Sequence, residues 1–193
     1  MNANIGMVHP VAAPVSAYTP GTSITYGSGL VVSEARAATL TWNRSDGHFY
    51  GDDVELDSDN GVTGYSLSFE PAGIADSVRK SLLGETESSS EYTVTDAASP
   101  DVGFGYVRVM RRKGSSGVVT SYEGWWFLKL KFSISNEETR TKEQSVEWRV
   151  PTLEGTGSGV SLDSTGVLKF CEHKTFETLT AAIAYVNGKA GIT

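Results

Sequence analysis

Hydrophobic and polar residues alternate with a period of two along most of this chain, which is the pattern of half-buried β-strands. The alternation is strongest in the segments 102–111 and 118–134, which flank the turn sequence Gly114-Ser-Ser-Gly117 and therefore predict a long hairpin. Three shorter segments show the same alternation: 38–42, 62–69 and 145–150. The pattern therefore predicts a chain made mainly of antiparallel β-strands.

Two segments, 74–84 and 175–188, repeat their apolar residues at helical spacing instead. Gly84 suits the C-terminal cap of the first helix, and Thr175 and Gly188 suit the two ends of the second. The expected fold is mainly β, with sandwich-like or barrel-like antiparallel sheets, one short inserted helix and a C-terminal helix.

The predicted domain organisation is simple, because 193 residues suffice for one domain with a sizeable core. Residues 1–23 are rich in Ala, Pro, Gly and Thr, which predicts an N-terminal arm on a single domain spanning 1–193. We expect no signal peptide and no membrane span, because no basic start and no long apolar run are present. Cys171 is the single cysteine, so no internal disulfide forms and folding in a reducing cytosol is expected.

The predicted strands are apolar on both faces at 106–110 and 125–128. One face is expected to fill the core, and the other needs a cover, either a helix of the same chain or a neighbouring subunit. In the second half of the hairpin, the alternation assigns one shared face to Trp126, Leu128, Leu130, Phe132 and Ile134.

The segment 50–61 concentrates negative charge in a chain whose net charge is −7, which argues against tight binding of nucleic acid. With Gly61 at position six of an EF-hand loop, positions one and three would be Leu56 and Ser58, so that motif fails. A less regular Ca²⁺ site remains an alternative. A glycosidase pair would need two acids in different environments, whereas these are equally solvated. The five acids are Asp52, Asp53, Glu55, Asp57 and Asp59.

No other segment carries the pattern of an enzyme or a metal centre. The sequence "EGTGSGV" at 154–160 lacks the third glycine and the following helix of a dinucleotide fingerprint, and no nucleophile elbow is present. Cys171 and His173 are too few for a structural zinc site. We predict no catalytic residues, no cofactor and no metal, and therefore a protein that acts through its surface.

Three segments in order resemble the major tail tube proteins of long-tailed, non-contractile bacteriophages. Residues 49–85 resemble that family's acidic segment, strand and short helix ending in Leu-Leu-Gly. Residues 102–157 resemble its glycine-aromatic strand, basic hairpin, aromatic strand and closing "PTLEGTG". Residues 174–188 resemble its terminal helix, and the similarity extends over roughly residues 24–188.

The resemblance implies a subunit of hexameric rings that stack into a hollow virion tail tube, assembled in the host cytoplasm. DNA would pass through without specific binding, no membrane would be involved, and the tape-measure, tail terminator and tip proteins would be partners. The acids would form a lumen wall or an inter-ring contact. Candidate assembly or lumen positions are Asp52, Asp53, Glu55, Asp57, Asp59, the strand residues Val107, Val109, Trp125 and Phe127, and the basic tip Arg111, Arg112 and Lys113.

The alternative to a tube subunit is a carbohydrate-binding or adhesin-like β-sandwich module. Aromatic side chains commonly form sugar-binding platforms, and Trp125, Trp126 and Trp148 are the candidates in this chain. Trp126 and Trp148 lie on the apolar side of their predicted strands, which favours a place in the core.

Overall fold

A computed structural model of the chain describes residues 2–51, 54–114, 117–136 and 150–192. The fold is mainly β with one short internal helix and one C-terminal helix, as the residue pattern predicts. The strands of the main sheet are β1 (Asn2–Thr19), β2 (Ser23–Tyr26), β3 (Leu30–Val31), β4 (Ala35–Arg44), β7 (Val62–Pro71), β10 (Val102–Gly114), β11 (Gly117–Asn136), β12 (Thr152–Ser158) and β15 (Cys171–Phe176).

Three small two-stranded sheets and two helices complete the described chain. The small sheets are β5 (Gly47–Gly51) with β6 (Val54–Asp59), β8 (Thr86–Ser88) with β9 (Glu91–Thr93), and β13 (Val160–Ser161) with β14 (Leu168–Lys169). The helices are α1 (Asp76–Leu83) and α2 (Leu179–Ala190).

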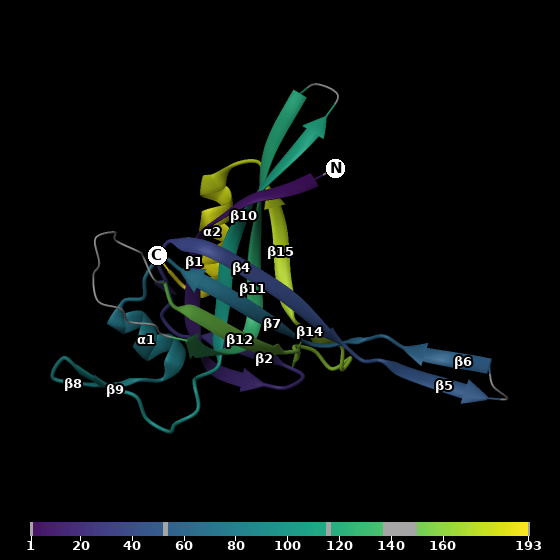
Figure 1. Cartoon of the computed structure of the whole chain (residues 1–193), viewed down its shortest axis with the longest axis horizontal. Coiled ribbons are helices and arrows are strands. Elements are labelled where there is room, and N and C mark those ends of the chain that lie inside the picture. Colours follow the sequence, from purple (N-terminus) through teal and green to yellow (C-terminus); the bar gives the residue numbers. More distant parts are fainter. Residues whose placement is uncertain (1, 52–53, 115–116, 137–149, 193) are drawn as a thin grey trace, which may run out of the picture.

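The main sheet is antiparallel, with the order β2-β1-β10-β11-β12-β7-β4. β11 is long enough to pair with β15 over residues 122–127 and with β12 from Leu130 onward. β4 also approaches β1, so the sheet curls into a barrel-like body (Figure 1). The predicted hairpin of 102–111 and 118–134 is confirmed as β10 and β11.

The central strands are buried on both faces within the chain. This arrangement shows what covers the segments 106–110 and 125–128, which are apolar on both faces. On the concave side an interior core forms from Tyr65, Leu67, Phe69, Phe104, Phe127, Leu130, Phe132 and Leu153, joined by Val78 and Leu82 of α1. On the other side α2 covers an outer core formed by Val11, Ala13, Val107, Trp126, Leu128, Ala182, Val186 and Ala190. The cover of the second face is therefore a helix of the same chain.

A β-bulge in the middle of β11 changes which face of the sheet its alternate side chains occupy. Phe127 pairs with Phe104, but Leu130 pairs with Val102, so three steps along β11 match two along β10. As a result, Trp126 belongs to the outer core while Leu130 belongs to the interior core. The prediction of one shared face for positions 126 to 134 is therefore wrong.

The N-terminal segment is an integral strand over residues 2–19, so the predicted arm is wrong for most of its length. β1 pairs with β10 from Asn2 opposite Arg112 to Pro14 opposite Val102. Val11 and Ala13 are fully buried in the outer core. Small side chains suffice for this position, because the large Trp126 and the residues of α2 fill the remaining space.

Both predicted helices are confirmed, but the predicted ends of the second helix are wrong. Gly84 ends α1 with φ 75°, as expected from the sequence. The second helix begins after Thr178 and ends at Gly191, whose φ is 69°. Thr175 instead pairs with Glu123 as part of β15, so neither Thr175 nor Gly188 is a cap.

Candidate assembly surfaces

Two hairpins project from the body and point in different directions (Figure 1). One is the ribbon of β5 and β6, whose two strands pair only with each other among the described residues. The other is the outer end of β10 and β11. A two-stranded ribbon is marginal in water by itself, which applies to the β5–β6 ribbon, whereas β1 supports the β10 side of the second hairpin as far as Arg112.

The charged candidates of the sequence fall on these two hairpins. Asp52 and Asp53 lie outside the described residues, whereas Glu55, Asp57 and Asp59 are positions of β6. Arg111 and Arg112 are exposed near the end of β10, and Lys113 follows them in the strand, opposite Val118. The acidic and basic segments therefore lie on separate projections of one molecule (Figure 1).

The apolar candidates are placed differently from what the pattern predicts. Val107 and Phe127 are completely buried, the first under α2 and the second in the interior core. Their assignment to an assembly surface is wrong, because a fully covered side chain offers nothing to a neighbour. Val109 and Trp125 are half-buried and keep part of their surface accessible.

Trp125 is the centre of a stacked group that the sequence does not reveal. Its ring is nearly parallel to the imidazole of His173, with centroids 4.6 Å apart and planes inclined by 13°. The guanidinium carbon of Arg108 lies 4.0 Å from the centroid of the Trp125 ring, at cation–π distance. The three residues come from β15, β11 and β10, and only the strand register brings them together.

Hydrogen bonds fix this group on the sheet. The indole Nε1 of Trp125 donates to Oε2 of Glu123 at 3.1 Å, and Nη2 of Arg108 donates to the Tyr106 hydroxyl at 3.1 Å. Burial is the main cause that raises the pKa of Tyr106, and the Arg108 charge opposes it. The arrangement is a polar-aromatic cluster at the margin of the interior core.

The histidines and acids of the described residues do not form a metal centre. No group of three or more His, Cys, Asp or Glu side chains in that part of the chain is placed to hold a metal ion. Nε2 of His9 lies 2.7 Å from Oδ1 of Asn187, and this hydrogen bond links β1 to α2. His48 contacts Asp46 near the base of the β5–β6 ribbon.

β4 ends the strand order of the main sheet, and its outer edge approaches β1 of the same chain. β4 pairs with β7 from Ala35 opposite Pro71 to Arg44 opposite Val62. Among the described residues, no strand pairs with its other edge.

The three-tryptophan platform of the carbohydrate-binding alternative is not assembled. Trp126 is fully buried beneath α2, and Trp125 lies on the opposite face of β11. Trp148 lies outside the described residues, as does the predicted strand 145–150 apart from Val150.

The chain is thus a mainly β protein with a curled antiparallel sheet and two projecting hairpins. Comparison with models of known protein families and with curated proteins finds no match. Within the described residues, no helix has the length and apolarity needed to cross a membrane.

Proposed function

We propose that this chain is the structural subunit of a tail tube of a long-tailed, non-contractile bacteriophage. Copies form hexameric rings, and the rings stack into a hollow tube that conducts DNA from the capsid to the host. The resemblance of residues 49–85, 102–157 and 174–188 to that family suggests this role. The protein resides in the virion tail after assembly in the host cytoplasm.

The projecting β5–β6 ribbon is the observation that carries this proposal. It has no strand partner in its own subunit among the described residues, and isolated ribbons gain little stability alone. Docking against another copy supplies the missing cover.

Electrostatics support a tube that transports DNA. The net charge of −7 per chain gives an assembled wall a negative potential, which repels phosphates over roughly 8–10 Å at physiological salt. DNA therefore passes without adhering. The acids of 52–59 also complement the basic tip 111–113 of another copy, so the two hairpins are candidate partners between rings.

Tape-measure protein would occupy the tube before ejection, and terminator and tip proteins would bind its two ends. These partners follow from the proposed family and contact the surfaces that remain open on terminal rings. They act as initiators or caps of a self-associating subunit.

Excision of the ribbon tests the proposal. The amide of Ser45 donates to the carbonyl of Gly61 at 2.8 Å, so the two ends of the ribbon lie close together. Replacing residues 47–59 by a short glycine linker should therefore preserve the body. We expect the intact chain to form rings or tubes with rising concentration, and the excised chain to remain a folded monomer.

Sedimentation velocity and negative-stain microscopy measure assembly, and thermal unfolding confirms the fold of the excised chain. If the intact chain stays monomeric at every concentration, with and without its tail partners, the proposed function is wrong. Normal tubes from the excised chain would show that the ribbon is not the assembly element.

A further inference from the structure

A pocket with a volume of about 330 Å³ opens at the base of the β5–β6 ribbon. Trp42, Val62 and Phe170 provide its apolar walls. The rings of Trp42 and Phe170 pack edge to face, with their centroids 6.2 Å apart. Arg44 and Lys169 supply the positive charges among its described lining residues, and the Asp163 carboxylate 3.2 Å from Nζ of Lys169 partly offsets the second of them. The pocket therefore offers an apolar interior with a positively charged margin.

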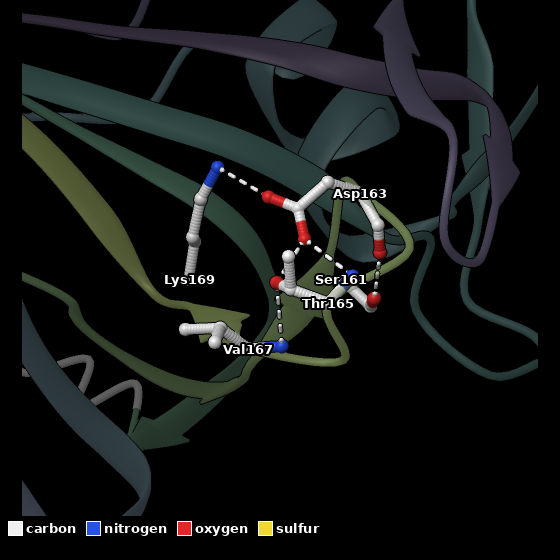
Figure 2. A network of polar contacts seen from close by, with 5 residues as sticks. All are labelled: Ser161, Asp163, Thr165, Val167 and Lys169. Atoms are coloured by element: carbon white, nitrogen blue, oxygen red, sulfur yellow. Dashed lines mark hydrogen bonds and ion pairs between the residues drawn. The ribbon is translucent and has the colours of Figure 1, made fainter.

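A hydrogen-bonded turn precedes the pocket residues Leu168 and Lys169, and Figure 2 shows its contacts. Asp163 accepts hydrogen bonds from the amide and the hydroxyl of Thr165, and its other oxygen lies 3.2 Å from Nζ of Lys169. The turn presents Val167 and Leu168 with 60% and 50% of their surfaces exposed. Two apolar side chains held in water beside an apolar pocket favour the docking of a partner.

The opposite end of the molecule carries a strongly exposed apolar side chain. Val94 follows the last residue of β9 and is 74% exposed, the largest value among the exposed large hydrophobic residues of the described chain. Its surrounding segment 84–101 contains no Lys, Arg or His and has five acids: Glu85, Glu87, Glu91, Asp96 and Asp101. Val94 is therefore an apolar side chain on an acidic segment.

The two features cannot meet within one molecule. β9 and β14 lie at opposite sides of the body along its longest axis, with α1 beside β9 and the β5–β6 ribbon beyond β14 (Figure 1). A contact between them therefore joins two copies, and each copy keeps one further pocket and one further Val94 available. Such a heterologous contact repeats from copy to copy.

We propose that Val94 of one subunit inserts into the pocket lined by Trp42, Val62 and Phe170 of the next subunit. Burial of the valine provides the attraction, and the exposed acids Glu91 and Asp96 on either side of it face Arg44 at the margin. This inference rests on the proposed self-assembly and names one contact that carries it.

Cys171 provides a direct test, because it also lines the pocket. The variant Val94→Cys, oxidised with diamide, should form disulfides between the new cysteine and Cys171 of a neighbour. Each chain then has one donor and one acceptor position, so a non-reducing gel should show a ladder of dimers, trimers and longer chains. A second variant, Val94→Cys with Leu168→Cys, offers a partner at the rim in case Cys171 lies too deep for disulfide geometry.

Two controls separate this contact from random cross-linking. Val31→Cys places a cysteine at another exposed valine, 46% exposed on β3, and should give no ladder. Val94→Cys with Cys171→Ser should stop at dimers. In solution, Val94→Asp should raise the concentration required for assembly by about tenfold or more, since it removes a buried valine and adds a charge.

The outcomes distinguish this contact from the proposed function. If intact chains form rings or tubes but neither cysteine variant gives a ladder, and Val94→Asp assembles normally, the contact is wrong and the function stands. If the intact chain never assembles, the function is wrong, and the absence of a ladder then overturns the contact as well. A ladder as long from Val31→Cys as from Val94→Cys also overturns it.

Discussion

At the scale of single residues, glycines make room for the large aromatic side chains of this protein. A Cβ atom on Gly103 would lie 2.4 Å from Cζ2 of Trp126, and one on Gly105 would lie 2.7 Å from its Cε3. The indole ring therefore lies directly against the backbone of β10, where only glycine fits. This packing explains the glycine-aromatic pattern of the segment 102–106.

The variant Gly103→Ala should destabilise the fold, because its methyl group would overlap both Trp126 and Tyr26. Overpacking of this kind costs about 1–3 kcal/mol of unfolding free energy. Urea denaturation followed by tryptophan fluorescence measures the loss. Gly73→Ala is the matched control, because a Cβ there meets nothing within 4 Å. Equal stability of the two variants would contradict this packing.

Alkaline pH should weaken the contact between β2 and β11. Burial raises the pKa of Tyr26 to about 12, from 10.0 in the unfolded chain, and its hydroxyl donates to the carbonyl of Leu128 at 2.9 Å. Because the folded state favours the neutral phenol, this stabilisation is complete below pH 10 and is lost as pH rises toward 12.

Denaturant titrations at a series of pH values measure this effect as a falling free energy of unfolding. Tyr26→Phe is the control, since it removes both the hydroxyl and its ionisation. The difference in stability between the intact chain and this variant should shrink above pH 10. A difference that stays constant across this range would show that Tyr26 does not contribute to the pH dependence.

At the scale of elements, a bulge and a helix determine what each strand contributes. The bulge in β11 sends Leu128 to α2 and Leu130 to the interior core. α2 then covers the outer face of β1, β10 and β11. The chain therefore completes both of its cores by itself.

Removal of the N-terminal cap of α2 tests how much this cap stabilises the helix that covers the outer core. The Thr178 hydroxyl accepts a hydrogen bond from the amide of Ala181 at 3.3 Å. Thr178→Ala should cost about 1 kcal/mol of unfolding free energy, measured by urea denaturation. Thr175→Ala is the control, because Thr175 is an exposed residue of β15. A greater loss from the Thr175 variant would contradict the assignment of the cap.

At the scale of the whole molecule, the body and the projections have separate roles. Substitution of the fully buried Val107 by Asp should disrupt folding, because an unpaired charge would enter the outer core. The exposed Arg111 and Arg112 of the second hairpin should contribute little to folding, and under the proposed function they should affect assembly instead. Variants of the two kinds therefore separate stability from self-association.

Reversal of the charge at the basic tip tests whether these residues affect assembly without affecting stability. The double variant Arg111→Glu and Arg112→Glu should change the free energy of unfolding by less than about 0.5 kcal/mol, because both side chains are exposed. Its assembly into tubes, observed by microscopy, should fail through repulsion from the acids of 52–59 on a neighbour. Lysines at those acidic positions should restore assembly, and normal tubes from the double variant would disprove the charge contact.

The sequence by itself determined the fold class, the long hairpin, both helices and the charged segments. These features depend on local periodicity and turn chemistry: Gly84 ends α1, and the alternation over 62–69 forms β7. Strand pairing and coverage depend on residues far apart in the chain, so the local pattern could not predict them.

Only the tertiary structure decided which faces are covered and which surfaces stay open. Val107 and Phe127 looked available because both faces of their strands are apolar, but α2 covers Val107 and the interior core of the curled sheet encloses Phe127. The stack of Trp125 with His173 arises from the register of β11 with β15, which no local pattern encodes. β1 has few large apolar residues, and it is buried because the bulk that completes its packing comes from Trp126 and α2.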